Sequence, residues 1–480
     1  MASVSASFAN TKFVRPIALA LFTSVAFACS GDKVTSSVTP PTENTTPARP
    51  NIIFLLADDQ RWDVTGAAGN QIIQTPNLDA LARQGVSFRN AYVTTPVCAI
   101  SRASIFTGEY ASRHGILDFT TDFTPEQLTR TYPALLKSAG YTTGFIGKFG
   151  VGNNLPAQMF DYWRGFPGQG DYQTRDESGN PMHLTRLQSK QALEFLDAQP
   201  KNKPFVLSVS FKAPHVQDDV PEPFQPEAND MGMYSNVTIP APATADDMYW
   251  NSFPQWFKAN NLARMRWQAL FSTPDLYQHS VKGYYRLVSG LDRVVGDIRN
   301  ELTKLGLEKN TVIIFSSDNG FFLGEMGMAH KWYGFEPSVR VPLIVYDPRN
   351  LSGQGGRVEN SIALNVDIAP TILDIAGIQA PSVMEGSSLV PLVHGQTVAG
   401  WRTDFLFEHL FPDPTIRRSA GVIGGRYKYL RYIDPNPNYE ALYDLQADPN
   451  ETTNFAGRPE YAAILDQLRQ RYTELAQRAR

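Results

Sequence analysis

Residues 50–60 read PNIIFLLADDQ, in which six consecutive apolar residues are followed by two aspartates. A near-continuous apolar run of this length is typical of a strand that is buried on both faces of a parallel sheet. Other apolar runs end in polar residues in the same way: TTGFIG before Lys148, FVLSVSF before Pro214 and His215, VIIFSS before Asp318 and Asn319, and VPLIVY before Asp347. The repeated plan predicts several buried strands in one sheet.

Helical patterns lie between these runs. The longest covers residues 280–307, with one apolar face formed by Val281, Tyr284, Val288, Leu291, Val295, Ile298 and Leu302. A helix capped by Thr75, with Pro76 at its first position, is predicted to end at Gly85, and another is predicted over 132–140. Strands that alternate with helices predict an α/β domain with a large doubly wound, mixed or parallel sheet flanked by helices.

The pattern changes near the end of the chain. Residues 421–433 (GVIGGRYKYLRYI) and 439–446 (YEALYDLQ) predict antiparallel strands, and Tyr461 to Arg480 predicts a terminal helix. We therefore expect the main α/β domain over residues 50–395 and a smaller C-terminal α+β subdomain over residues 396–480.

Residues 1–28 have the pattern of a signal peptide, because Lys12 and Arg15 precede an apolar stretch that ends in Ala26-Phe27-Ala28. That stretch of 13 residues is shorter than the roughly 20 that span a bilayer. Cys29 follows in FACSGDK, which resembles a bacterial lipoprotein signal, and simple secretion is the alternative. Residues 29–49 are rich in Ser, Thr and Pro and predict a disordered tether. We expect an exported bacterial protein, periplasmic or at the cell surface, with a lipid anchor through Cys29 or none.

The composition of the 480-residue chain excludes some functions. The formal net charge of −4 and the 19% charged residues do not favour nucleic acid as a partner. Seven histidines and two cysteines offer little for a zinc cluster.

Polar residues at the strand ends predict a metal site. Ligands of open α/β sheets bind outside the carboxyl ends of the strands, where Asp58, Asp59, Asp318 and Asn319 are expected. Carboxylate and amide oxygens suit a hard cation, and calcium accepts six to eight of them in irregular geometry, whereas magnesium demands a tight octahedron. Either pair alone is also typical of a helix cap or a turn.

Cys98 begins the segment CAISRASIFTG, which predicts a short buried helix that ends at Gly108. The amide groups at the start of that helix would face an anion, and Arg102, one turn later, lies on the same face. A buried structural cysteine is the alternative for Cys98.

This segment resembles the signature of the type I sulfatases, CxPSRxxLxTG, in which the cysteine is converted to formylglycine. The family belongs to the alkaline phosphatase-like superfamily. The stretch PNIIFLLADDQ resembles its first metal-binding strand, and TPNLDALARQGVSFRNAY resembles the helix that follows. SSDNGFFLGEMGMAHKWYGFEPSVRVPLIV resembles its second metal strand and active-site loop, and DIAPTILDIAG and YDLQADPNET resemble later landmarks. The resemblance covers most of the chain from Pro50.

The resemblance implies a catalytic domain that hydrolyses sulfate esters, with sulfated carbohydrates as the expected substrates. It implies that one calcium ion is held by Asp58, Asp59, Asp318, Asn319 and the modified Cys98, and that the sulfate is surrounded by Arg102, Lys148, His215 and Lys331. Cations must neutralise the anionic ester before a nucleophile attacks it, and His215 or Lys331 would protonate the departing alcohol. A formylglycine-generating maturation enzyme is the implied partner.

Two positions depart from the family pattern. Ile100 stands where the signature has proline or sometimes alanine, a position that the modifying enzyme reads. Gly150 stands where most members have a histidine, two residues after the lysine that matches Lys148. Some sulfatases that act on glucosamine 6-sulfates also lack that histidine and have an asparagine nearby, a role that Asn153 or Asn154 would fill here.

Two alternative functions remain at this point. One is a phosphonate or phosphodiester hydrolase on the same scaffold, and the other is a non-catalytic glycan-binding lipoprotein with an unmodified Cys98. A zinc phosphatase is disfavoured, because Asn319 replaces the expected histidine. Residues 248–256, with Tyr249 and Trp250, and the region around Glu408 and His409 are candidates for a sugar pocket, with packing as the alternative.

Overall fold

The computed structural model describes residues 49–200, 202–218, 220–350 and 355–479. The predicted signal peptide, Cys29 and nearly all of the predicted tether lie outside the described residues. None of the helices within the described ranges combines the length and apolarity that a bilayer-spanning helix requires.

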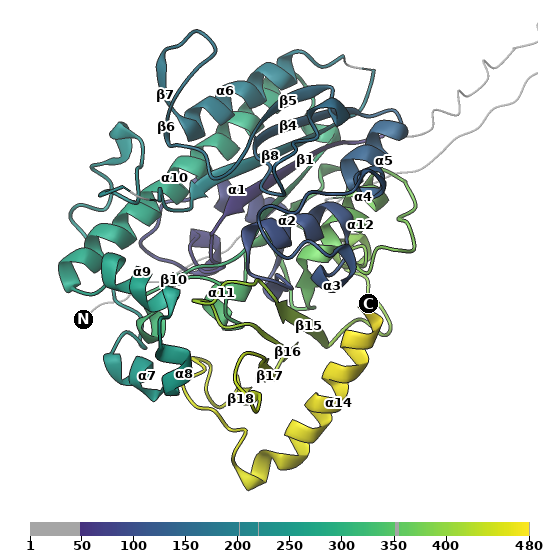
Figure 1. The fold of residues 1–480 in the computed structure, drawn as a ribbon. Helices are drawn as coiled ribbons and strands as arrows, with labels where there is room; N and C mark the ends of the chain where they lie inside the picture. Colours follow the sequence, from purple (N-terminus) through teal and green to yellow (C-terminus); the bar gives the residue numbers. More distant parts are fainter. Residues whose placement is uncertain (1–48, 201, 219, 351–354, 480) are drawn as a thin grey trace, which may run out of the picture. The chain divides into compact units, whose positions relative to one another are not determined.

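The centre of the fold is an eight-stranded sheet (Figure 1). Its strands, in spatial order, are β13 (Arg357–Glu359), β2 (Val86–Phe88), β12 (Leu343–Tyr346), β9 (Thr311–Ser317), β1 (Asn51–Asp58), β8 (Phe205–Pro214), β4 (Thr142–Lys148) and β5 (Tyr162–Phe166). β1 is parallel to both neighbours, β8 and β9, whereas β12 is antiparallel to β9 and β2. The predicted mixed α/β sheet is confirmed. Because β12 is antiparallel to β9, Asp347 follows it at the opposite edge from Asp318.

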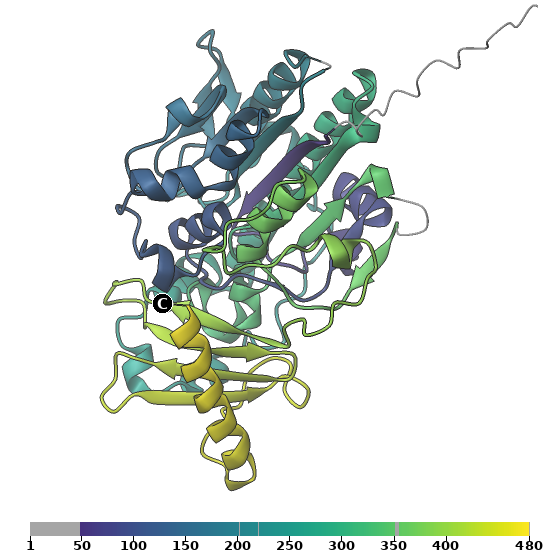
Figure 2. The same cartoon turned by 90° about the vertical axis from the view of Figure 1, so that its right-hand side faces the viewer.

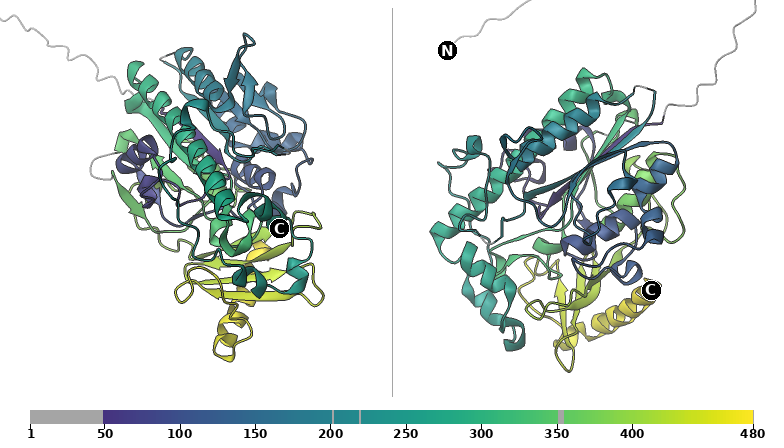
Figure 3. Two further views of the ribbon diagram at one scale, coloured as in Figure 1. Left: turned by 90° about the vertical axis from the view of Figure 1, so that its left-hand side faces the viewer. Right: turned by 45° about the horizontal axis from the view of Figure 1, so that its top comes forward.

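Two helical layers cover this sheet, because successive side chains of a strand point to opposite faces. Ile53 and Leu55 of β1 pack with α1 (Pro76–Gln84), α6 (Leu184–Asp197) and α10 (Pro274–Lys304). Phe54 and Leu56 pack on the other side with α2 (Cys98–Thr107), α5 (Tyr132–Ser138) and α12 (Ile368–Ile375). The two layers are seen on either side of the strands in Figure 3. The apolar run of β1 is therefore buried on both faces, as predicted.

Two helix starts differ from the sequence expectation. The predicted helix over 280–307 begins earlier, at Pro274, because the Thr273 side chain accepts a hydrogen bond from Leu276 N at 3.2 Å. The helix after Thr75 forms as predicted, but Thr75 does not cap it. The carboxylate of Asp292 accepts hydrogen bonds from the first turn instead, including one from Leu78 N at 2.7 Å. A cap that comes from a distant helix cannot be predicted from local sequence.

The C-terminal part contains a four-stranded antiparallel sheet, as predicted. It consists of β15 (Asp404–His409), β16 (Ser419–Gly424), β17 (Tyr427–Tyr432) and β18 (Tyr439–Asp444). Helix α14 (Ala462–Arg478) lies across one face of this sheet (Figure 2). Leu465 of this helix packs with Tyr429 and Leu442. The other face packs on the main domain.

A buried ion cluster joins this sheet to the main domain. Lys428 of β17 is fully buried, and its Nζ lies 3.0 Å from Glu336 Oε1 and 2.6 Å from Glu451 Oε1. Glu336 begins α11 (Glu336–Val339), and its amide donates to Glu451 Oε2 at 2.7 Å. Lys428 thus pairs with two carboxylates from different parts of the chain.

The substitution Lys428→Met should destabilise the protein by about 3–5 kcal/mol, because it leaves two buried carboxylates without this cation. Urea unfolding monitored by circular dichroism measures the effect. Lys190→Met is the matched control: Lys190 is partly exposed and pairs with Asp176 and Glu177, so its loss should cost about 0–1 kcal/mol. Equal unfolding midpoints for the two variants would contradict this role of Lys428.

Candidate active site

The predicted metal residues meet at the carboxyl edge of the sheet. Asp58 ends β1, Asp318 and Asn319 follow the adjacent β9, and all four acidic or amide side chains, including Asp59, are fully buried. The backbone ties the two strand ends together, because Asp318 N donates to Ala57 O and Asp59 N donates to Asp318 Oδ1, each at 3.1 Å. Asp59 has a φ of 67°, a left-handed conformation that aspartate tolerates better than most residues. This turn directs its side chain toward the site.

The other predicted residues come from three further elements. Lys148 is the last residue of β4, His215 directly follows β8, and Cys98 is the first residue of α2. Lys331 follows the short strand β11 (Ala329–His330). All of them are buried, and Arg102 lies one turn after Cys98 in α2. The structure therefore brings every predicted site residue to one place.

This cluster can hold a metal ion. Ligand atoms of Asp58, Asp59, Cys98 and His215 lie within 4.8 Å of one another. Asp59 Oδ2 and Asn319 Oδ1 are buried and accept no hydrogen bond from the described residues. Buried acceptors without a partner are costly, and a cation would satisfy both. His215, which the sequence assigned to the sulfate, thus also lies beside the predicted metal ligands.

Three cationic side chains neutralise the carboxylates. Lys148 Nζ contacts Asp58 Oδ2, and Arg102 contacts the same oxygen through Nη2 at 3.3 Å. Arg102 Nε also donates to Asp318 Oδ2 at 2.8 Å. Lys331 Nζ contacts Asp59 Oδ1 and lies 3.1 Å from Cys98 Sγ. Cys98 is therefore surrounded by the ion pairs rather than by the apolar core.

The electrostatic environment acts differently on neighbouring groups. Burial raises the pKa of Asp59 to about 7, although Lys331 opposes the shift. Burial would also raise the pKa of Asp58, but Lys148 and the other cations hold it well below its usual value. Burial, together with the carboxylate of Asp58, raises the pKa of the Cys98 thiol. An unmodified Cys98 is thus a protonated thiol at neutral pH, and a thiol is a poor nucleophile.

The missing histidine at Gly150 has a structural reason. Gly150 has a φ of 76°, and a Cβ atom there would lie 2.6 Å from Cδ of Arg102. A side chain at this position would displace Arg102 from its ion pairs. Asn153 and Asn154, the predicted substitutes, are exposed, and their backbone N–H groups donate to Asp122 Oδ1 at 2.6 and 2.9 Å.

Gln169 is the side-chain amide that reaches the site, and no sequence pattern pointed to it. Its Oε1 accepts a hydrogen bond from Lys148 Nζ at 2.6 Å, whereas its Nε2 donates to none of the described residues. Gln169 lies in the loop PGQGD (167–171) after β5, whose composition predicts a turn. Only the pairing of β5 with β4 brings it beside Lys148.

The sugar-pocket candidates lie in several surroundings. His409 is fully buried, and Glu408 accepts a hydrogen bond from Ser112 N at 3.2 Å. Trp250 is buried in the core beneath Arg264, whose guanidinium carbon lies 5.1 Å from the ring centre. Tyr249 lines a separate cavity that none of the predicted metal or sulfate residues lines.

Divalent cations should raise the thermal unfolding temperature of the protein, because they bind the folded state. At a cation concentration 100 times Kd, the free energy of unfolding rises by about 2.7 kcal/mol. Asp59→Asn should remove most of this gain, and asparagine tolerates the left-handed backbone of residue 59. Differential scanning calorimetry with calcium, magnesium or manganese chloride, against a chelator, measures it.

Asp292→Asn provides the control, because Asp292 is buried but caps helix α1 far along the chain from the site residues. It should lower the unfolding temperature and keep the gain from the cation. A gain of the same size in Asp59→Asn would show that the cation binds elsewhere.

Comparisons with known proteins show which family the chain resembles. A family model described as Sulfatase matches residues 50–378, and one described as N-sulphoglucosamine sulphohydrolase, C-terminal, matches residues 324–478. An N-acetylglucosamine-6-O-sulfatase of Bacteroides thetaiotaomicron is 30% identical, over 88% of this chain and 85% of that protein. An N-sulphoglucosamine sulphohydrolase of Homo sapiens is 29% identical, over 88% and 89%.

Solved structures show the same fold. The structure of BT4656 in complex with its substrate D-glucosamine-2-N,6-O-disulfate has a TM-score of 0.77 and 29% identity, and the match covers 90% of this chain and 98% of that one. A phosphonate monoester hydrolase of Agrobacterium radiobacter has a TM-score of 0.73 with 21% identity, over 90% and 96%, which shows the fold alone. Since the family model covers more than half of the chain, this protein belongs to the sulfatase family and is an enzyme that hydrolyses sulfate esters.

Proposed function

We propose that this sulfatase removes sulfate from a carbohydrate, of the 6-O-sulfated glucosamine class, with a formylglycine made from Cys98 and one calcium ion. The position of Cys98 carries the proposal: its Sγ lies 3.1 Å from Lys331 Nζ and 3.4 Å from Asp58 Oδ1, within the cluster of predicted metal ligands. The sugar class is supported by the relatives named above, which act on sulfated or acetylated glucosamine.

Calcium is the ion that the ligand atoms favour. Asp58, Asp59, Asp318 and Asn319 supply carboxylate and amide oxygens, and calcium binds such oxygens without a strict geometry. When present, the formylglycine supplies the nucleophile, and the calcium ion supplies charge that polarises it and the sulfate. The side chains of the protein perform the remaining tasks.

The charge balance of the site favours an anionic substrate. Three carboxylates (Asp58, Asp59 and Asp318) face three cationic groups (Arg102, Lys148 and Lys331), so the buried network is close to neutral by itself. A divalent cation then leaves the site positive. Arg102, Lys148 and Lys331 are held in place by their ion pairs, so they do not need to reorganise as charge develops on the ester.

Lys331 is the proposed donor of a proton to the departing alcohol, and His215 lies in the cluster of predicted metal ligands. His215 Nδ1 donates to Val216 O at 2.7 Å, which fixes the ring, and burial lowers the pKa of His215 well below its usual value. Nε2 therefore carries a lone pair, 3.6 Å from Asp59 Oδ2. Lys331 Nζ lies beside Cys98. Gln169 adds a side-chain amide next to Lys148.

The chain is also proposed to be exported, with Cys29 as the site of a lipid anchor. The sequence pattern of residues 12–29 supports this proposal. Export would carry the enzyme to polymeric glycans outside the cytoplasm.

Mass spectrometry of protein from its native host should show Cys98 as formylglycine, and its first residue should be an acylated Cys29. The same sample should release sulfate from glucosamine 6-sulfates and from an aryl sulfate. Cys98→Ala, which keeps the fold but cannot be modified, is the inactive control. An unmodified thiol in an active enzyme would refute the formylglycine mechanism, and faster turnover of an aryl phosphodiester would refute the assigned substrate class.

Gln169→Ala should lower kcat/KM for glucosamine 6-sulfates about 10²- to 10³-fold if its amide stabilises the reacting ester. Gln169→Glu should be at least as damaging, because it removes the donor and adds a carboxylate beside Lys148. Asn154→Ala, which removes the exposed alternative amide, should leave the rate unchanged. Steady-state kinetics on the folded variants decide between the two amides, and a normal rate in Gln169→Ala would exclude this role.

A further inference from the structure

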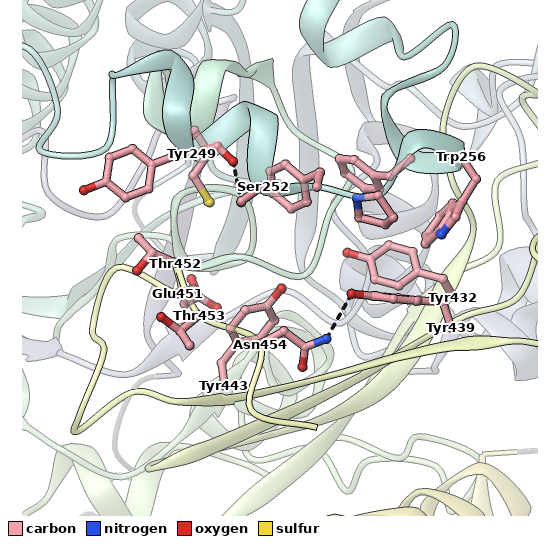
Figure 4. A pocket seen from close by; sticks show the side chains of 14 residues that line it. Tyr249, Ser252, Trp256, Tyr432, Tyr439, Tyr443, Glu451, Thr452, Thr453 and Asn454 are labelled. Atoms are coloured by element: carbon pink, nitrogen blue, oxygen red, sulfur yellow. Dashed lines mark hydrogen bonds between the residues drawn. The ribbon is translucent and has the colours of Figure 1, made fainter. Parts of the chain in front are cut away.

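A second cavity, of about 230 Å³, lies between helices α7 (Asp247–Ser252) and α8 (Gln255–Lys258) and the strands β17 and β18 (Figure 4). The loop 451–454 closes one side of it. None of the residues that we assign to the cation or the sulfate lines it. Met326, however, belongs both to its lining and to the segment that connects Asn319 with Lys331.

One end of the cavity is a rigid aromatic wall. Trp256 packs edge-to-face against Tyr432 and Tyr439, with ring centres 5.3 and 5.2 Å apart (Figure 4). The rings of Phe253 and Phe257 stack on each other, with their centres 4.5 Å apart. Aromatic faces of this kind bind the C–H faces of sugar rings through apolar contact, and little conformational entropy is lost because the rings are already packed.

Tyrosine hydroxyls at the cavity have free hydrogen-bonding capacity. The rings of Tyr432 and Tyr443 are 2% and 5% exposed, yet their hydroxyls bond to none of the described residues. The Tyr439 hydroxyl accepts from Asn454 Nδ2 at 3.0 Å and so can still donate its own proton. The Asn454 Oδ1 atom has no acceptor capacity left for a ligand, because it accepts hydrogen bonds from Leu442 N and Ala456 N. The cavity therefore offers several hydroxyls on a fixed frame.

The charges of the cavity disfavour an anion. Among the described residues, its lining contains one ionisable acid, Glu451, and no lysine or arginine. Glu451 is already paired with Lys428 behind the wall, at 2.6 Å. A sulfate or carboxylate group in the cavity would lie near this acid without a free cation, whereas a neutral polyhydroxylated ligand meets only hydroxyls and ring faces.

We propose that this cavity binds one uncharged sugar unit of the glycan, separate from the unit whose sulfate is cleaved. The proposal rests on the proposed carbohydrate substrate. The volume of the cavity, about 230 Å³, is below the roughly 300–1,000 Å³ of pockets for drug-sized ligands, which suits a single sugar ring. Met326 gives the bound sugar contact with the segment that carries Lys331.

Binding of uncharged trisaccharides of glucose, galactose or N-acetylglucosamine to the full protein tests the proposal, by saturation-transfer NMR and calorimetry. At least one should bind, and Tyr443→Phe and Tyr432→Phe should each weaken it about three- to tenfold, because each removes one hydrogen-bonding hydroxyl. Trp256→Ala should abolish detectable binding. For a sulfated oligosaccharide of three or more units, Tyr443→Phe should raise KM and leave kcat unchanged.

Tyr429→Phe is the matched control, because it removes a hydroxyl from the opposite face of the same sheet, where Tyr429 donates to Glu440 at 2.6 Å. It should leave sugar binding unchanged. No binding of any trisaccharide, or unchanged binding in Tyr443→Phe and Tyr432→Phe, would overturn the sugar site. Aryl sulfate turnover measured in parallel separates the two proposals, since its absence in the parent protein contradicts the sulfatase mechanism and not the cavity.

Discussion

The burial of the Asp58 carboxylate is the constraint on which the rest of the site depends. Asp58 has no exposed surface and shares one oxygen between Lys148 and Arg102, which are themselves buried. A buried charge is tolerated only when it is paired, so these three residues must meet. They come from β1, β4 and α2, and the ion pairs therefore fix the position of the Cys98 helix relative to the sheet.

The same constraint explains the departures from the family pattern. Arg102 reaches Asp58 and Asp318 through the space beside Gly150, and a side chain at Gly150 would fill that space. The histidine is therefore incompatible with this position of Arg102, and Lys148 obtains Gln169 as its neighbour. Ile100 is fully buried in the core that α2 shares with Phe335 and Leu430. An apolar residue at position 100 thus has a packing role whether or not the modifying enzyme reads it.

Buried ion pairs join the C-terminal sheet to the main domain. Lys428 pairs with Glu336 at the start of α11, close in sequence to Lys331, and with Glu451, at the edge of the second cavity. The Lys428 ion pairs therefore link the segment that follows Lys331 to the loop at the edge of the cavity. The phosphonate monoester hydrolase with the same fold shows that the main sheet by itself does not determine the substrate. Residues at the cavity and beside Lys148, such as Gln169, are where specificity is expected to lie.

The sequence by itself determined the buried strands, the mixed α/β class and the antiparallel C-terminal sheet, and it predicted a cation site at the strand ends, because apolar runs and the polar residues after them are local patterns. It also located Asp58, Asp318 and Cys98 through motifs that a family resemblance made specific. Only the tertiary structure decided the Asp292 cap of α1, the place of Gln169 beside Lys148, the exclusion of a side chain at Gly150 and the cavity at Trp256. Each of these is a contact between residues far apart in the sequence, and such contacts depend on how strands and helices pack rather than on any local preference.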